Sequence, residues 1–189
     1  MSDELNLLRH SLAHLLAAAV MELWPDTKRT IGPAIENGFY YDFEFVEAIT
    51  EKDLKKIEKK MRDLLPKWES FEKSEVNKKE ALKVFESNEF KKELIEEFAE
   101  EGQKLTLYKS GNFIDLCRGG HVDNPSKEID RKAFKLTHIA GAYWRGDSKK
   151  PQLTRIYGVA FKTPEQLQEH LERMQRAEKF NHKKLGEEM

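Results

Sequence analysis

Two short segments, far apart in the sequence, carry most of the side chains that can bind a metal ion, transfer protons or hold a small polar substrate. The first is His-Ser-Leu-Ala-His at residues 10–14, and the second is Cys-Arg-Gly-Gly-His at residues 117–121. The chain contains one cysteine and six histidines, and four of these seven residues lie in the two segments. This concentration predicts a functional site.

A metal site is one chemistry open to these residues. His10 and His14 are four residues apart, so on a helix they lie one turn apart and can bind the same zinc ion. Cys117 and His121 would complete a set of four ligands. A zinc ion with four protein ligands is structural, whereas a catalytic zinc ion keeps one position open for water.

Acid–base catalysis without a metal is the other chemistry. Histidines that titrate near neutral pH can orient a water molecule and transfer protons. Asp115, two residues before Cys117 in an expected strand, lies on the same side and can hold an ammonium group or orient a histidine. The pKa of the Cys117 thiol does not follow from the sequence, so a thiolate is not assumed. The residues alone leave both chemistries open.

The composition is that of a folded, highly charged protein. Hydrophobic residues make up 39% and charged residues 35% of the 189 residues, enough for one core without disulfides. One cysteine cannot form an internal disulfide, and no signal-like N-terminus or membrane-spanning apolar run is visible. We therefore expect a cytoplasmic protein with no membrane partner. The net charge of −1 means that RNA binding requires a local basic patch.

The histidine pair lies on an expected helix over about residues 3–24. Leucines at three- and four-residue spacing form one apolar stripe. His10 and His14 lie opposite this stripe, among small and apolar neighbours, so we expect both sides of the helix to be covered. Pro25 ends the helix because proline cannot continue it.

The other expected elements are hairpin-paired strands and capped helices. Asn37-Gly38 predicts the first hairpin, and Asn77 and Thr163 are expected helix N-caps. The expected strands cover residues 29–35, 39–45, 68–76, 105–109, 113–116, 133–144 and 152–161. The expected helices after the first cover about 51–66, 77–101 with a break at 87–88, and 163–185.

This order predicts an α+β fold, a mostly antiparallel sheet of roughly six strands with helices packed on it. We expect one domain over residues 1–189. Within it, about 1–48 and 104–161 form the sheet and helix that carry the site, about 50–103 a charged helical lobe, and about 163–189 a C-terminal helix.

Five motifs together resemble those of the editing domain of bacterial-type threonyl-tRNA synthetases, the second additional domain shared with alanyl-tRNA synthetases. They are His10-x-x-x-His14, Ile31-Gly32-Pro33, Asn37-Gly38-Phe39-Tyr40-Tyr41-Asp42, Cys117-Arg118-Gly119-Gly120-His121 and Ala140-Gly141-Ala142-Tyr143-Trp144-Arg145-Gly146. The resemblance runs from about Leu7 to Leu185, and the tyrosine-rich strings favour the threonyl branch. It implies the editing-domain architecture of that family.

The resemblance implies an aminoacyl-tRNA ester hydrolase that removes serine from mischarged Ser-tRNA(Thr). One methyl group separates serine from threonine and gives only about 1–3 kcal/mol of discrimination, so a second site must remove the wrong product. The chain lacks counterparts of the aminoacylation core and the anticodon-binding domain. We therefore expect the editing fragment of a threonine-tRNA ligase, although a freestanding editor fits the same residues.

The resemblance also implies catalytic residues. His10 and Lys91 would position or activate the hydrolytic water. His121 would act at the aminoacyl or ribose end of the substrate. Lys92 is an alternative to Lys91, because the stretch around both lysines departs from the family pattern.

Four further residues would bind the substrate and shape the pocket. They are His14, Tyr41, Asp115 and Cys117. The resemblance to the threonyl branch implies no required cofactor. The alanyl branch binds zinc at the positions of His10, His14, Cys117 and His121, so zinc stays an alternative.

The expected partner is the acceptor end of tRNA(Thr) carrying serine. Arg118, Lys135, Arg145 and Arg155 are candidates to approach it. We expect a homodimer for the full-length enzyme and a monomer for the fragment. Two alternative functions stay open, a zinc-dependent alanyl-type trans-editing protein and a non-catalytic, zinc-stabilised RNA-binding module.

Overall fold

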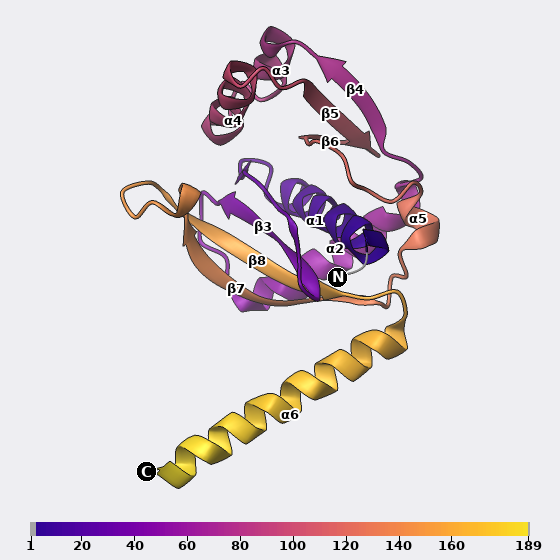
Figure 1. The fold of residues 1–189 in the computed structure, drawn as a ribbon, viewed down its shortest axis with the longest axis vertical. Helices are drawn as coiled ribbons and strands as arrows, with labels where there is room; N and C mark the ends of the chain where they lie inside the picture. Colours follow the sequence, from indigo (N-terminus) through magenta and orange to yellow (C-terminus); the bar gives the residue numbers. More distant parts are fainter. Residues whose placement is uncertain (1–2, 189) are drawn as a thin grey trace.

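The computed structural model describes residues 3–188, which form two antiparallel sheets, helices packed against them and one long projecting helix (Figure 1). The helices are α1 (Asp3–Leu23), α2 (Leu54–Leu64), α3 (Lys78–Val84), α4 (Glu89–Glu100), α5 (Pro125–Glu128) and α6 (Pro164–Glu188). The strands are β1 (Lys28–Arg29), β2 (Ala34–Ile35), β3 (Gly38–Glu44), β4 (Glu72–Val76), β5 (Leu105–Ser110), β6 (Phe113–Leu116), β7 (Phe134–Tyr143) and β8 (Gln152–Ala160). The predicted α+β class is confirmed.

The larger sheet has the strand order β1-β3-β8-β7, and β2 pairs with β3. Phe39, Tyr41 and Phe43 alternate along β3 and pack into the core that contains α1. Side chains of α1 are buried around most of its circumference from Leu8 to Val20. The expectation that both sides of this helix are covered is therefore confirmed.

The smaller sheet has the order β4-β5-β6, with α3 and α4 packed on it. Ala81 of α3, Phe85 at its C-cap and Ile95 of α4 form its core together with Leu105 and Leu107 of β5. Strand β6 is the edge of this sheet that lies closest to α1 (Figure 1). The segment that follows β6, residues 117–121, is thereby brought to the junction of the two sheets.

The expected strand over residues 29–35 is interrupted. Pro33 has no N–H to donate, and a Cβ atom on Gly32 would lie 2.2 Å from Cδ2 of Tyr41. The close approach of this backbone to the Tyr41 ring separates β1 from β2. The chain still follows β3, since Asp42 N–H donates to the Ile31 carbonyl at 3.0 Å.

Two other predictions have different outcomes. The helical region 77–101 breaks where expected, because Asn88 begins a new helix and its side chain accepts the N–H of Lys91 at 3.1 Å. The expected strand 68–76 is shorter, since β4 begins only at Glu72. The short helix α5 was not predicted.

Elements of the expected charged lobe contact both sheets. Helix α2 packs on α1 and β7, whereas α3 and α4 pack on β5. The internal boundaries of the domain stay a prediction.

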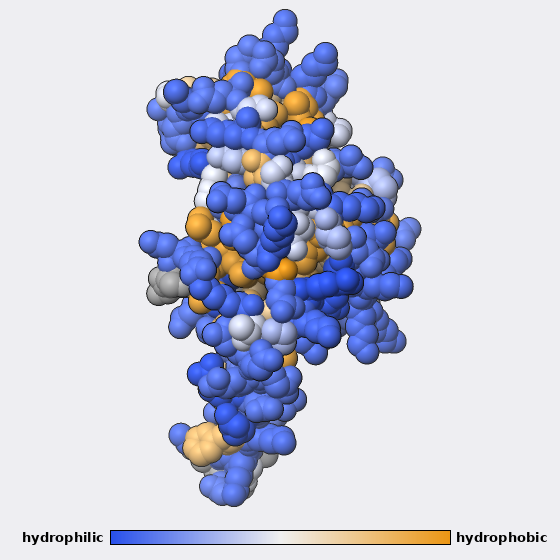
Figure 2. Space-filling view, turned by 90° about the vertical axis from the view of Figure 1, so that its right-hand side faces the viewer, coloured by the Kyte–Doolittle hydropathy of each residue, from blue (hydrophilic) through white to orange (hydrophobic). Residues whose placement is uncertain are grey.

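Helix α6 leaves the body after a capped start. Gln166 N–H donates to Thr163 Oγ1 at 3.2 Å, and from residue 172 to 187 every side chain is exposed. Figure 2 shows this helix as a mostly hydrophilic projection, with apolar side chains gathered on the body above it. Within residues 3–188, no helix combines the length and apolar character needed to cross a membrane.

Gly38→Ala should destabilise the larger sheet. A Cβ atom there would lie 1.9 Å from the carbonyl oxygen of Gly158, so we expect a loss of about 1–3 kcal/mol of unfolding free energy, measured by urea denaturation. Gly186→Ala is the control, because its Cβ meets nothing within 4 Å and alanine favours a helix. Equal stability of Gly38→Ala and wild type would contradict this packing.

Candidate functional site

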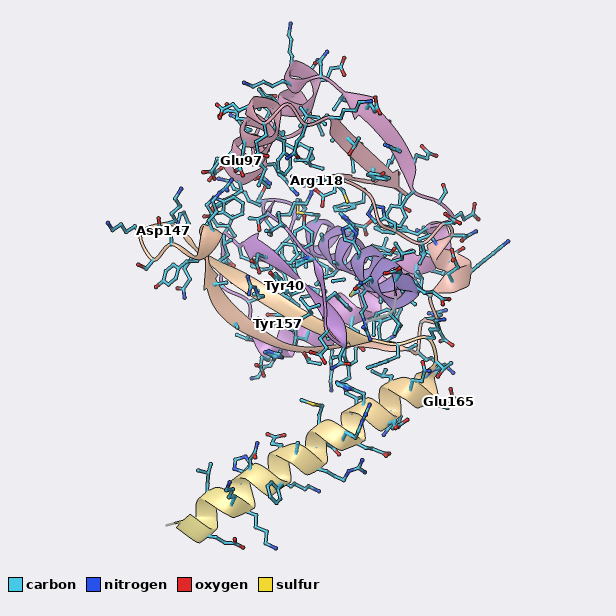
Figure 3. The ribbon with its side chains drawn as sticks, in the orientation of Figure 1. Tyr40, Glu97, Arg118, Asp147, Tyr157 and Glu165 are labelled. Carbon is cyan, nitrogen blue, oxygen red and sulfur yellow. The ribbon has the colours of Figure 1, made fainter. Side chains whose placement is uncertain are left out.

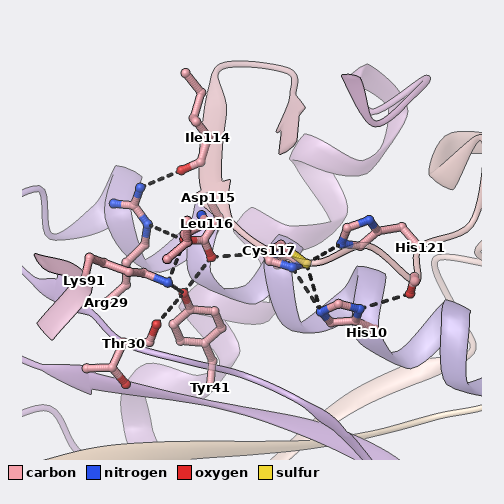
Figure 4. A network of polar contacts seen from close by, with 12 residues as sticks. His10, Arg29, Thr30, Tyr41, Lys91, Ile114, Asp115, Leu116, Cys117 and His121 are labelled. Atoms are coloured by element: carbon pink, nitrogen blue, oxygen red, sulfur yellow. Dashed lines mark hydrogen bonds and ion pairs between the residues drawn. The ribbon is translucent and has the colours of Figure 1, made fainter. Parts of the chain in front are cut away.

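The structure brings the two histidine-containing segments together. Helix α1 supplies His10 and His14, and the loop after β6 supplies Cys117 and His121. Figure 4 shows His10 beside Cys117 and His121. One nitrogen or sulfur atom from each of these residues lies within 4.8 Å of all the others. His14 is buried, whereas the other three are partly exposed, so the cluster can be reached from solvent.

The loop takes its shape from two glycines. Gly119 and Gly120 have φ values of 106° and 93°, a region that side chains rarely allow. Gly119 N–H donates to Cys117 Sγ at 3.3 Å. The same sulfur lies 3.3 Å from His121 Nε2 and 3.6 Å from His10 Nε2.

Hydrogen bonds outside the cluster determine which histidine nitrogens face it. His10 Nδ1 lies 3.0 Å from the Gly120 carbonyl oxygen, which only accepts, so Nδ1 carries a proton. His14 Nδ1 lies 3.2 Å from a carboxylate oxygen of Asp115 and carries a proton for the same reason. The two Nε2 atoms therefore face each other at 3.2 Å. A proton or a metal ion must lie between them, because two lone pairs at this distance repel.

Asp115, at the end of β6, is the buried centre of a second group of contacts. Its Oδ2 atom accepts the Tyr41 hydroxyl at 2.7 Å and faces His14. Its Oδ1 atom lies 2.8 Å from Lys91 Nζ and accepts Leu116 N–H at 2.9 Å. His14 therefore joins the carboxylate to the histidine–cysteine cluster.

Lys91, and not Lys92, enters the site. Its side chain points inward from the first turn of α4, and its Nζ also donates to the Tyr41 hydroxyl at 3.3 Å. Only 1% of Lys91 is exposed, whereas Lys92 is exposed on the outer side of the helix. Of the two lysines that the sequence left open, Lys91 is the one that lies in the site. Its role stays a prediction.

The electrostatics of the cluster favour a thiolate. Burial alone would raise the pKa of Cys117, but its contacts with His10, His121 and His14 lower it to about 3. Burial would lower the pKa of His14, but hydrogen bonds to Asp115 and Cys117 outweigh it and raise the pKa to about 9. A thiolate beside a protonated His14 supplies the proton that the facing Nε2 atoms require.

Neighbouring charges and burial also shift the pKa values of Asp115 and Lys91. Burial opposes the charge on Asp115, but the charge of Lys91 and the hydrogen bond from His14 hold its pKa well below the usual range. Burial lowers the pKa of Lys91, with Asp115 acting in the opposite direction. The ammonium group of Lys91 therefore gives up its proton more readily than that of an exposed lysine would.

Aromatic rings hold His121 in place, and the sequence offered no signal for them. Phe71 stacks on its ring with centroids 4.1 Å apart, His10 stacks at 4.6 Å, and Tyr108 contacts its edge at 4.7 Å. Phe71 was expected in a strand, but it precedes β4. Arg29, a third contact of Asp115 Oδ1, was also missed.

A cavity of about 280 Å³ opens onto both groups. Its polar wall contains His10, His14, Tyr41, Lys91, Asp115, Cys117 and Arg118. Its apolar wall contains Ile31, Pro33, Leu94, Phe98 and Leu116. The cavity therefore offers both polar and apolar side chains to a ligand.

The four cations expected near tRNA have different positions. Arg118 lines the cavity and lies in the space between the sheets (Figure 3). Arg155 pairs with Asp42 through two contacts of 2.8 and 3.0 Å on the larger sheet. Arg145 pairs with glutamates of α4, and Lys135 is exposed on β7. Of the four, the structure brings Arg118 to the site.

The four donors His10, His14, Cys117 and His121 fit a zinc ion. Tetrahedral zinc separates nitrogen and sulfur ligands by roughly 3.3–3.6 Å, close to the 3.2, 3.3 and 3.6 Å between neighbouring atoms of the cluster. The Gly120 carbonyl and the Asp115 carboxylate orient His10 and His14 as outer partners of a metal ligand do. A zinc site is therefore compatible with these residues.

Comparisons with known proteins agree with the resemblance. Residues 105–157 match the family described as the threonyl and alanyl tRNA synthetase second additional domain. The chain is 50% identical over 181 residues to a threonine–tRNA ligase of Borreliella burgdorferi, covering 96% of this chain and 31% of the relative. A threonine–tRNA ligase of Fusobacterium nucleatum is 50% identical over 187 residues, covering 97% of this chain and 30% of the relative.

A third relative, the threonine–tRNA ligase of Laribacter hongkongensis, is 50% identical over 190 residues and covers 100% of this chain. The chain spans between 29% and 31% of the length of these three relatives. The recognition made from the motifs is thereby confirmed.

Cys117 should be a thiolate at neutral pH. It is the only cysteine, so the ultraviolet absorbance of the thiolate in chelator-treated protein reports on it alone. We expect the signal to persist as the pH falls and to disappear near pH 3, since the deprotonated form dominates above the lowered pKa. In urea the pKa should return to about 8.5. A folded protein without thiolate absorbance at pH 7 would contradict the assignment.

Proposed function

We propose that this chain hydrolyses the aminoacyl ester of mischarged Ser-tRNA(Thr). It would do so as the editing part of a threonine–tRNA ligase. Residues 105–157 match the second additional domain of threonyl and alanyl tRNA synthetases, and the chain resembles the threonyl branch. The observation that carries the proposal is one cavity lined by His10, Lys91, Asp115 and Cys117. Proton acceptors, a cation and a fixed carboxylate therefore surround the space open to an ester.

Ester hydrolysis needs a water molecule, a proton acceptor and a proton donor. We assign the positioning and activation of water to His10 and Lys91, which line the cavity from opposite elements. The water oxygen adds to the ester carbonyl carbon and its proton passes to one of these groups. The bond to the ribose oxygen then breaks, and that oxygen takes up a proton, giving serine and uncharged tRNA.

Binding of the substrate is assigned to the remaining residues. His121 lies 3.3 Å from Cys117 Sγ and would hold the aminoacyl or ribose end, while His14, Tyr41 and Cys117 line the cavity and would shape the pocket. The oxygens of Asp115 are already surrounded by donors, so Asp115 would act on the substrate by orienting Lys91 and His14. The extra methyl group of threonine would clash in a pocket that serine fits.

The donor geometry favours a second candidate function. A zinc ion held by His10, His14, Cys117 and His121 would make the chain resemble the alanyl branch, and when bound it would supply Lewis acidity or structural support. The relatives that match almost the whole chain carry the name threonine–tRNA ligase. We therefore propose the metal-independent threonyl-type reaction first.

The proposed partner is the serine-carrying acceptor end of tRNA(Thr), which places the reaction in the cytoplasm. Arg118 is the cation best placed to meet it, because it lines the cavity and lies over the Phe98 ring at 4.6 Å. We expect the isolated chain to be a monomer and a full-length ligase to be a dimer.

The proposal is tested by comparing deacylation of Ser-tRNA(Thr), Thr-tRNA(Thr) and Ser-tRNA(Ala), with and without chelator. We expect rapid loss of serine from tRNA(Thr) that survives chelation, with Thr-tRNA(Thr) preserved. Loss that depends on zinc, together with hydrolysis of Ser-tRNA(Ala), would favour the alanyl type. No hydrolysis and chelator-sensitive folding would favour a non-catalytic RNA-binding module.

His10→Ala should remove most of the hydrolytic activity, by about 10²–10⁴-fold if it acts as the proton acceptor. Cys117→Ser should keep substantial activity, because the thiolate is assigned to pocket shape and not to attack on the ester. His182→Ala, exposed on α6, is the matched control. Full activity in His10→Ala, or a trapped acyl-thioester on Cys117, would overturn these assignments.

A further inference from the structure

Arg29 lies at the boundary between the two sheets and contacts the editing site without lining its cavity. It belongs to β1 at the edge of the larger sheet, where it pairs with Phe43. Its guanidinium group crosses to the smaller sheet and lies between the rings of Phe85 and Phe113, 5.1 and 5.0 Å from their centroids. A positive group held between two ring faces has little freedom to move.

The side chain of Arg29 holds the strand that carries Asp115. Its Nη2 donates to the carbonyl oxygen of Ile114 at 2.5 Å. Its buried Nε has no hydrogen-bond partner among the described residues and lies 3.5 Å from Asp115 Oδ1. Figure 4 shows the arginine beside the carboxylate, on the same oxygen as Lys91. The arginine thus acts on Asp115 by charge and through the preceding peptide.

The backbone of Arg29 holds the helix that carries Lys91. Its carbonyl oxygen accepts Asn88 Nδ2 at 2.8 Å. The other side-chain atom of Asn88, Oδ1, accepts the N–H of Lys91 at 3.1 Å and thereby caps α4. One residue is therefore connected to both members of the Lys91–Asp115 pair, which come from separate elements of the chain.

We propose that Arg29 is a positioning residue of the editing site, which aligns the Lys91 ammonium group with the Asp115 carboxylate across the two sheets. This inference rests on the proposed hydrolase function. The guanidinium group keeps Asp115 in place, and Asp115 in turn holds Lys91 at 2.8 Å, so its effect belongs to turnover and not to tRNA binding.

Arg29→Met tests this role, because methionine keeps the contact with the two rings but removes the charge and the donors. We expect kcat for Ser-tRNA(Thr) to fall by about 10²-fold, the effect of a small misplacement of reacting groups, with KM close to the wild-type value. Arg29→Lys keeps the charge and one donor, so it should recover part of the rate. In a Lys91→Met background, Arg29→Met should have little further effect.

Arg62→Met is the matched control, measured in parallel. Arg62 also lies over a phenylalanine ring, Phe134 at 5.4 Å, and donates to a backbone carbonyl, that of Arg131 at 2.9 Å, but it lies on α2 away from the cavity. It should keep the wild-type rate. A wild-type kcat in Arg29→Met would overturn the inference, as would a raised KM without rescue by lysine or a full additional loss in the Lys91→Met background.

Crystal structures of wild type and Arg29→Met separate this inference from the function on which it rests. We expect the Lys91 Nζ–Asp115 Oδ1 contact, 2.8 Å in the intact site, to be broken in Arg29→Met. An unchanged contact would overturn the positioning role whatever the activity. If the wild-type chain hydrolyses no Ser-tRNA(Thr), the proposed function fails, and this contact alone decides the role of Arg29.

Discussion

The burial of one carboxylate, that of Asp115, constrains the rest of the site. A buried charge costs several kcal/mol unless other groups replace the water that it has lost. Asp115 obtains these groups from four other elements, α1, β1, β3 and α4, through His14, Arg29, Tyr41 and Lys91. Folding can bury this residue only when both sheets are in contact, so the geometry of the site and the association of the sheets are one requirement.

His14 connects the Asp115 carboxylate to the Cys117 thiolate. One ring nitrogen faces Asp115 and the other faces His10, and the negative groups of Asp115 and Cys117 together raise the pKa of the imidazole. The Asp115 carboxylate is buried, whereas His10, Cys117 and His121 are partly exposed. The charges of Asp115 and His14 are thus arranged before any ligand enters the cavity.

Local patterns were sufficient to predict some parts of the molecule. Helix α1, the Asn37-Gly38 hairpin and the break at Asn88 follow from apolar spacing and from capping or turn residues, which act over a few positions. We expected His10 and His14 to lie close to Cys117 and His121, because histidine and cysteine are rare in the chain. Their distances and the thiolate depend on packing that no local pattern encodes.

The missed contacts are those that cross between the sheets. Arg29 resembles any strand arginine until β6 and α3 are placed beside it, and Phe71 was assigned to a strand on alternation alone. Gly32-Pro33 was recognised as part of a motif, yet its effect on β1 and β2 came from the Tyr41 ring beside it. Each error concerns a residue whose surroundings are distant in sequence.

Helix α6 is long, but only its start is packed against the rest of the molecule. Its 25 residues reach about 37 Å at 1.5 Å per residue, but only its first two turns bury side chains, such as Leu167 and His170. A rotation of about 10° at this root would sweep the far end through roughly 6 Å. A small rotation of the first two turns would therefore become a displacement larger than one helical turn at the far end.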